Sequence, residues 1–192
     1  EKGMAVRTTE WEEHELAILK ELSLLTAKPL LYVANVDEED LRARSRSAAV
    51  EERARREQAG FVVICGDLEA EIALLEREEE RKEFMADMGL AESGLEQLVK
   101  AGYGVLNLIT FYTTVGTELR AWTVARGTKA PQAAGKIHSD MEHGFIKAEV
   151  VSYDDFVKAG SLSAAREEGH LRLEGKEYTV RDGDMLHFKF SQ

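Results

Sequence analysis

The sequence has few of the residues that cross-link, anchor or export a protein. Only one of its 192 residues is cysteine, Cys65, which excludes an intrachain disulfide and a zinc site built from several cysteines. A reducing cytoplasm is the expected compartment. No apolar stretch approaches the roughly 20 residues of a membrane helix, so we expect no membrane partner. The first residues, EKGMAVRTTEW, lack both an initiator methionine and a signal-peptide core, and a fragment or processed product is expected.

Positive charge is scarce in the first half of the chain. The whole sequence holds 25 Lys and Arg against 36 Asp and Glu, a formal net charge of −11. Residues 103–192 contain 11 of the basic and 12 of the acidic residues, so residues 1–102 contain 14 and 24, a net charge of −10. Such an acidic half argues against broad contact with nucleic acid, whereas the nearly neutral second half leaves room for a local basic face.

What the sequence does have is a regular succession of apolar and charged segments. Two short apolar runs, 30–34 (LLYVA) and 61–65 (FVVIC), are typical of strands buried on both faces, and a charged, helix-forming segment follows each of them. The order strand, helix, strand, helix predicts a parallel sheet of α/β type. Helices are expected at 8–26, capped by Thr8 or Thr9, and at 39–58, 67–87 and 91–101.

After Gly102 the pattern changes to short β-rich runs, which predict a small α+β domain. Residues 104–114 and 118–125 are expected to pair as a hairpin across Val115, Gly116 and Thr117. The remaining expected elements are short helices near 131–138 and 152–158, strands at 146–151, 177–181 and 185–190, and a tight turn at 182–184.

A polar side chain ends the first apolar run. Asn35 follows LLYVA and Cys65-Gly66 ends the next run, so both lie where doubly wound α/β sheets bind ligands, outside the carboxyl ends of the strands. The N-x-x-E spacing from Asn35 to Glu38 resembles the N-K-x-D motif with which P-loop GTPases recognise guanine. Glu38 is longer than aspartate and Val36 replaces the lysine, so strict guanine preference is not expected and adenine is the alternative. The other interpretation is an asparagine that ends a strand and a glutamate that caps the next helix.

Other reactive residue types form no such pattern. His138 and His143 are five residues apart, which is not the i, i+4 spacing of a helical metal pair, and we expect no metal site. Cys65 at a strand end is expected to be a small packed residue rather than a nucleophile. Trp11 and Leu16 on the first helix either pack within the protein or are exposed because their partner lies outside the chain.

Long stretches of the chain resemble the YchF (Obg-like ATPase) family. Residues 120–138 (RAWTVARGTKAPQAAGKIH), the following SDMEHGFIKAEVVSYDDF and the final EGKEYTVRDGDMLHFKF are similar to its C-terminal TGS domain, a ubiquitin-like β-grasp fold. Upstream, LLTAKPLLYVANVDE resembles the family's fourth nucleotide-binding motif and GDLEAEIALL the segment around its fifth. The resemblance extends from about residue 22 to residue 190.

The resemblance implies a domain division and a nucleotide site. It implies a helical, coiled-coil arm remnant at 1–26, the C-terminal part of a P-loop nucleotide-binding domain at 27–102 and a TGS domain at 103–192. It also implies ATP or GTP as the ligand, Mg²⁺ held with the nucleotide by residues outside this chain, and the ribosome as a partner. The residues that it implies contact the base are Asn35, Val36, Glu38, Cys65 and Gly66.

The phosphate-binding loop of such enzymes is missing from the sequence. The string G-x-x-x-x-G-K-[ST], whose backbone N–H groups and lysine hold the phosphates, does not occur, and no D-x-x-G segment precedes residue 30. We therefore expect this chain to be the C-terminal part of a protein, with the missing N-terminal part as its partner. The full-length family member would be an ATPase or GTPase, but this chain alone is not expected to hydrolyse nucleotide, and no catalytic residue is assigned.

Basic residues gather around the first predicted helix of the second half. They are either ordinary surface charge or an edge that contacts phosphates of ribosomal RNA, in which case binding would depend on salt and not on RNA sequence. Two functions stay open, namely part of a ribosome-associated ATPase or a non-catalytic ribosome-binding or RNA-binding module regulated by nucleotide. The basic residues are Arg126, Lys129, Lys136, His138 and Lys147.

Overall fold

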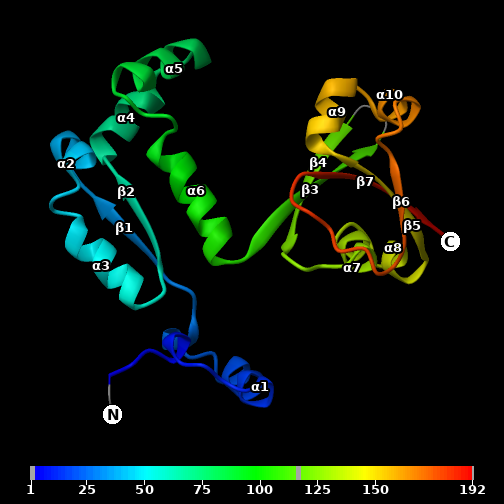
Figure 1. Ribbon diagram of the computed structural model, residues 1–192, viewed down its shortest axis with the longest axis horizontal. Coiled ribbons are helices and arrows are strands. Elements are labelled where there is room, and N and C mark those ends of the chain that lie inside the picture. Colours follow the sequence, from blue (N-terminus) through cyan, green and yellow to red (C-terminus); the bar gives the residue numbers. More distant parts are fainter. Residues whose placement is uncertain (1–2, 116–117, 192) are drawn as a thin grey trace. The chain divides into compact units, whose positions relative to one another are not determined.

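The computed structural model describes residues 3–115 and 118–191 (Figure 1). The chain forms two compact units, Glu1–Leu106 and Asn107–Gln192. No helix of the described residues is long and apolar enough to cross a membrane.

The first unit begins with short helical segments. They are the 3-10 helix η1 (Val6–Thr8), the α-helix α1 (Glu13–Leu22) and the 3-10 helix η2 (Leu25–Ala27). The predicted helix over 8–26 is therefore too long. It begins only at Glu13, where the Glu15 side chain accepts a hydrogen bond of 2.9 Å from the backbone N–H of Glu12, and it ends where Ser23 adopts a left-handed conformation.

The helix α1 buries none of its residues, and all of them are described. Its apolar side chains are open to solvent, with Leu16 51% exposed and Leu22 59% exposed. Trp11, just before the helix, is 36% exposed. Leu16 fits the interpretation in which the side chain is exposed, whereas the Trp11 indole contacts the chain itself, because its Nε1 donates to the carbonyl of Val6 at 2.9 Å.

The two apolar runs form a pair of parallel strands, as predicted. Strand β1 (Leu31–Asn35) lies beside β2 (Gly60–Ile64) in register, from Leu31 opposite Gly60 to Asn35 opposite Ile64. Helix α3 contacts both strands, and α6 contacts β2 most extensively. The other helices described in this unit are α2 (Glu38–Ala43), α3 (Ala48–Arg56), α4 (Gly66–Leu74), α5 (Glu78–Asp87) and α6 (Gly94–Val105).

Two predicted helices are each divided in the structure. The helix expected over 39–58 breaks at Arg44, whose φ of 57° is left-handed, and gives α2 and α3. The helix expected over 67–87 ends at Leu75, which is extended, and a second helix begins at Glu78. Neither break contains a proline or glycine, the residues that usually mark helix ends in a sequence.

The second unit is a five-stranded mixed sheet with the order β4-β3-β7-β5-β6. The central strands β3 and β7 are parallel, with Tyr112 opposite Met185, and the other pairs are antiparallel. This order is that of a β-grasp sheet. The predicted hairpin of β3 and β4 is confirmed, whereas the turn residues 116 and 117 lie outside the described residues. The strands are β3 (Leu108–Val115), β4 (Glu118–Ala125), β5 (Phe145–Ser152), β6 (Arg172–Glu174) and β7 (Asp184–Phe190).

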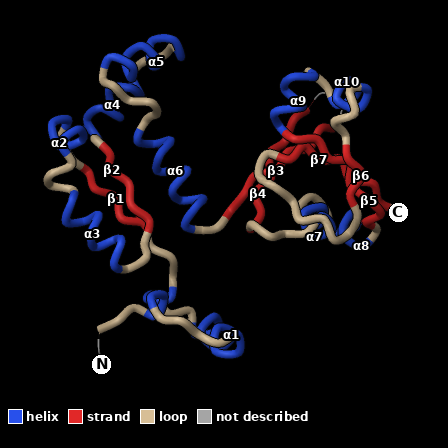
Figure 2. Tube along the Cα trace, viewed as in Figure 1, coloured by secondary structure: helices blue, strands red, loops and turns tan. Residues whose placement is uncertain are grey.

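Helices cover both faces of this sheet (Figure 2). Against one face, α7 (Ala130–Gly135) contributes three buried alanines to the main core around Phe111, and α8 (Ser139–His143) follows α7. Against the other face, α9 (Tyr153–Ala159) and α10 (Leu162–Glu167) pack on Val151 and Met185.

Four local features of this unit differ from the expectations. Helices α8 and α10 and strand β6 were not predicted. The strand expected at 177–181 is wrong, because this segment makes only an isolated bridge, from Lys129 to Thr179, and then turns through Gly183, whose φ is 80°. Tyr178 in this segment packs against the main core, which explains its apolar pattern.

Candidate functional site

The carboxyl ends of β1 and β2 meet at one edge of the parallel pair. Asn35 is the last residue of β1, and its side-chain Oδ1 accepts a hydrogen bond of 2.9 Å from the backbone N–H of Gly66, just beyond β2. A Cβ atom at Gly66 would lie 3.2 Å from that same oxygen, so a glycine suits the close approach. The two loops singled out in the sequence are thus joined by a direct hydrogen bond.

The residues next to this hydrogen bond continue the link between the strands. The backbone N–H of Val36 donates to the carbonyl of Ile64 at 2.9 Å, one step beyond the last strand pair. Cys65 is 3% exposed and is the N-cap residue of α4, which fits a packed side chain. The Cys65 side chain is therefore buried beneath the loop surface, whereas Asn35 and Gly66 are exposed to solvent.

Two acidic residues, Asp37 and Glu38, lie at the start of α2 and have different surroundings. Asp37 is the N-cap residue, and its Oδ1 accepts from the backbone N–H of Asp40 at 2.9 Å while its Oδ2 pairs with Arg46 at 2.6 Å. Glu38 is the first helical residue and is exposed. Asp37 therefore caps α2. The interpretation in which Glu38 caps this helix is wrong.

A buried carboxylate that the sequence did not single out holds the loop after α2. Asp40 is 2% exposed, and it accepts hydrogen bonds from Ser45 Oγ at 2.6 Å and from the backbone N–H groups of Arg46 and Ser47 at 2.8 and 3.2 Å. The hydrogen bond from Ser45, followed by that from the Arg46 backbone, lowers the pKa of Asp40 from its ordinary value. An aspartate a few residues ahead of Ser-Arg-Ser was the only sequence signal for it.

A hollow of about 440 Å³ lies over these loops. It combines the predicted Asn35 and Val36 with residues from the loop that Asp40 holds. The predicted Glu38, Cys65 and Gly66 are not part of its lining. The lining residues are Ala34, Asn35, Val36, Asp37, Arg46, Ser47, Val50 and Asp67.

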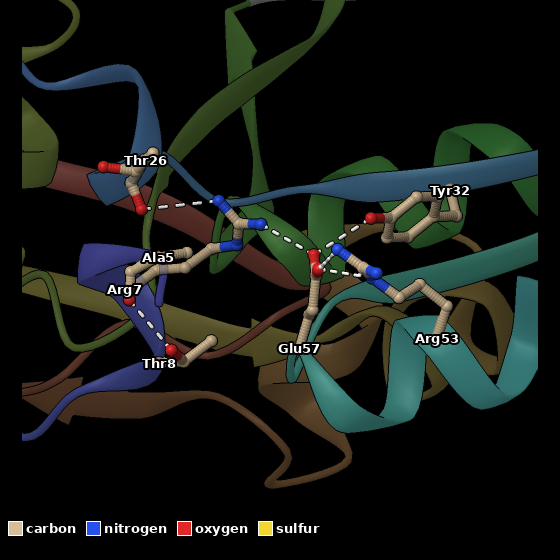
Figure 3. Close-up of polar contacts among 7 residues, drawn as sticks. All are labelled: Ala5, Arg7, Thr8, Thr26, Tyr32, Arg53 and Glu57. Carbon is tan, nitrogen blue, oxygen red and sulfur yellow. Dashed lines mark hydrogen bonds and ion pairs between the residues drawn. The ribbon is translucent and has the colours of Figure 1, made fainter. Parts of the chain in front are cut away.

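A second polar cluster ties the first residues of the chain to the parallel strands (Figure 3). Glu57, just after α3, accepts hydrogen bonds from Arg7 Nη2 at 2.8 Å, Tyr32 Oη at 2.9 Å and Arg53 Nε at 2.5 Å. The hydrogen bond from Tyr32 is the largest cause that lowers the pKa of Glu57, partial burial opposes it, and the two guanidinium groups add to it. Arg7 also donates to the carbonyl of Thr26. The cluster joins residues far apart in the sequence, so no local pattern could have predicted it.

The five basic residues predicted as a phosphate-contacting edge are all exposed but do not share one surface. Lys129 and Lys136 flank α7 and His138 caps α8, on the segment that covers the main core. Lys147 lies on β5, on the opposite face of the sheet, because its neighbour Ala148 points into the main core. Arg126 follows β4 directly.

Two of these basic residues already have partners in the chain. Lys129 Nζ pairs with Glu177 at 2.5 Å, and His138 Nδ1 accepts a hydrogen bond of 3.2 Å from the backbone N–H of Asp140. Within residues 3–115 and 118–191, no group of three or more His, Cys, Asp and Glu side chains is arranged to hold a metal ion.

Comparison with known proteins gives consistent matches over the whole chain. A family model named YchF-GTPase_C, described as a protein of unknown function (DUF933), matches residues 108–191. A Bacillus subtilis protein named ribosome-binding ATPase YchF is 47% identical over 194 residues, which cover 100% of this chain and 53% of that protein. The Obg-like ATPase 1 of Rattus norvegicus is 42% identical over 186 residues, 95% of this chain and 46% of that protein.

A solved structure agrees with these sequence matches. The YchF GTPase of Schizosaccharomyces pombe superposes with a TM-score of 0.83 at 32% identity, covering 97% of this chain and 50% of that one. The chain belongs to the YchF family. The resemblance found in the sequence and the predicted α/β plus α+β fold class are thereby confirmed. This YchF-family chain spans about half the length of the curated relatives it matches.

Proposed function

We propose that this chain is the nucleotide-base-recognising and ribosome-contacting part of a YchF-type ATPase or GTPase. The ligand is ATP or GTP with Mg²⁺, and the phosphate and metal ligands come from the N-terminal part of the same protein. Residues 1–26 are the arm remnant, residues 27–102 the C-terminal part of the nucleotide domain and residues 103–192 the TGS domain. The cytoplasm, expected from the single cysteine, is where ribosomes lie.

The hydrogen bond from Gly66 N to Asn35 Oδ1 is the observation that carries the nucleotide proposal. It brings the two loops together at the carboxyl edge of a parallel pair, where α/β sheets bind nucleotides. Asn35 contacts the base with its amide group, Val36 with its main chain, and Cys65 and Gly66 form the loop that passes beside the ring. Glu38 is the residue that discriminates between bases, because Asp37 already performs the capping.

The experiment is titration of the full-length protein with ATP and with GTP by calorimetry. Because one hydrogen bond contributes about 0.5–1.5 kcal/mol, Asn35→Ala is expected to weaken binding of either nucleotide by roughly 3-fold to 10-fold. Glu38→Asp restores the side-chain length of the guanine-reading motif and is expected to shift the ratio of affinities toward GTP.

The control is Glu39→Asp, the same change at an exposed position one residue further along α2. An unchanged ATP to GTP ratio in Glu38→Asp, or an equal shift in Glu39→Asp, would remove Glu38 from the base site. Detectable ATP turnover by the isolated 192-residue chain would show that the catalytic groups do not lie upstream.

The ribosome proposal rests on the names of the relatives and on the second unit. We expect ribosomes to stimulate nucleotide hydrolysis by the full-length protein if the chain serves an ATPase. Hydrolysis that is indifferent to ribosomes, together with binding of ribosomes without nucleotide, favours the non-catalytic module instead.

A further inference from the structure

The Ser47 hydroxyl is buried and has no hydrogen-bond partner among the residues that the structure describes. Ser47 is 1% exposed and lies at the break between α2 and α3. A buried hydroxyl without a partner costs free energy, because it gives up its hydrogen bonds to water and gains none in the protein. Folded proteins rarely keep such a group, and a bound ligand is one partner that would satisfy it.

The usual role of a serine at this position is not performed. Ser47 is the N-cap residue of α3, but its φ of −76° and ψ of −17° are helical rather than extended, and its side chain accepts no capping hydrogen bond. Its backbone is held on both sides, because its N–H donates to Asp40 Oδ2 at 3.2 Å and its carbonyl accepts from the N–H groups of Val50 and Glu51 at 3.0 Å. The backbone therefore fixes the position of the hydroxyl, while the hydroxyl itself has no structural task.

Ser47 lines the hollow of about 440 Å³ that lies over the two loops. Asn35 and Val36, which are proposed to contact the base, line the same hollow. Two charged residues of the lining, Asp37 and Arg46, pair with each other at 2.6 Å. The Ser47 hydroxyl adds a neutral group that has no protein partner and can both donate and accept a hydrogen bond.

The edge of a purine base calls for a group of this kind. The Oδ1 of Asn35 already accepts from the backbone N–H of Gly66, so the amide offers the ligand its Nδ2 as a donor. A donor suits N7, which is an acceptor in adenine and in guanine alike, and it therefore does not distinguish the two bases. At the neighbouring 6-position adenine carries an amino donor and guanine an oxygen acceptor, and a hydroxyl can serve both.

We propose that the Ser47 hydroxyl forms a hydrogen bond to the 6-position of the bound purine. Its oxygen accepts from the 6-amino group of ATP, and its O–H donates to the 6-oxygen of GTP. The inference rests on the proposed nucleotide site and adds to it a residue that neither the sequence pattern nor the family resemblance singled out. Glu38 discriminates between the two bases, whereas Ser47 lets the site hold either of them.

The test compares three nucleotides by calorimetry on the full-length protein, namely ATP, GTP and purine riboside triphosphate, which carries only hydrogen at the 6-position. Because a neutral hydrogen bond contributes modestly to binding, Ser47→Ala is expected to weaken the binding of ATP and of GTP by roughly 3-fold to 10-fold each. The same variant should bind purine riboside triphosphate as tightly as the wild type does, because that base offers no group to Ser47.

A second measurement separates a ligand contact from a structural role. Hydrogen exchange over residues 45–56 is followed in the nucleotide-free full-length protein. Ser47→Ala should leave this exchange unchanged or slow it, because it removes a buried hydroxyl that has no partner. Ser45→Ala is the structural contrast and should speed the exchange, because the Ser45 hydroxyl donates to the buried Asp40 at 2.6 Å.

Three results would overturn the inference. They are unchanged affinities of Ser47→Ala for ATP and GTP, an equal loss for all three nucleotides, and faster exchange over residues 45–56 in Ser47→Ala. The first removes only Ser47 from the site, because the wild-type protein still binds nucleotide. If the wild-type protein binds neither ATP nor GTP, the proposed function itself fails, and the role of Ser47 fails with it.

Discussion

The hydroxyl of Tyr178 should make a measurable and pH-dependent contribution to the stability of the second unit. Tyr178 Oη donates a 2.7 Å hydrogen bond to Asp184 Oδ2, and Asp184 is 3% exposed at the start of β7. Burial, followed by the hydrogen bond and charge of Asp184, raises the pKa of Tyr178 from 10.0 to about 12. Two pKa units correspond to about 2.7 kcal/mol, and partial exposure of the ring reduces the expected contribution to about 1–2 kcal/mol.

The sign follows from which state holds the proton more tightly. Because the pKa of Tyr178 is higher in the folded state, the contribution is fully present below pH 10 and is lost as the pH rises through 12. The variant Tyr178→Phe should lose the contribution at every pH. The difference in unfolding free energy between wild type and variant should therefore shrink between pH 10 and pH 12.

Urea unfolding followed by the fluorescence of Trp122 reports on this unit, because the indole lies in it and donates to Thr113. Tyr153→Phe is the matched control, since that ring is 48% exposed and surface substitutions usually change stability by less than about 0.5 kcal/mol. A difference between wild type and Tyr178→Phe that stays constant up to pH 12 would refute the raised pKa of Tyr178, to which burial contributes most and the hydrogen bond to Asp184 next.

Two further variants test the first unit. Gly66→Ala places a Cβ 3.2 Å from Asn35 Oδ1 and should weaken nucleotide binding by the full-length protein, measured by calorimetry. Gly102→Ala is the control and should leave binding unchanged, because its Cβ meets nothing within 4 Å. Equal effects of the two variants would contradict the role of the Gly66 loop. Glu57→Gln should speed hydrogen exchange of the amides near residues 5–9 by removing the charge that Arg7 pairs with, and Glu52→Gln, a change in exposed ion pairs, should leave those amides unchanged.

Strands β1 to β4 were predictable because each pair reflects one local rule. The apolar runs that became β1 and β2 are short, continuous and flanked by charged segments, which is the pattern of parallel strands. The hairpin of β3 and β4 follows from two β-rich runs with a glycine between them. The proximity of Asn35 and Gly66 could be predicted from the sequence, because the carboxyl ends of neighbouring parallel strands lie at the same edge of a sheet.

The errors have a different physical origin. The helix over 39–58 breaks because the Asp40 carboxylate takes the backbone N–H groups of Arg46 and Ser47, a competition that helix propensity does not include. The strand expected around Tyr178 fails because its apolar residue packs against the main core without pairing along a strand. The Glu57 cluster needs four positions spread over 50 residues, which only the folded chain brings together.

The Glu57 cluster contacts β1 near its first residue, and the Asn35–Gly66 hydrogen bond lies at its last residue. The pairing of β1 with β2 determines whether a change at one end of the strand reaches the other. Tyr32 on β1 reaches Glu57, while Asn35 at the end of β1 reaches Gly66. All five residues of β1 are in register with β2, so the position of Asn35 is fixed by the strand pairing and not by the Tyr32 contact. Glu57→Gln should therefore loosen the first residues of the chain and leave the ATP affinity of the full-length protein unchanged. A loss of affinity in that variant would mean that β1 transmits the position of the N-terminal segment to the base site.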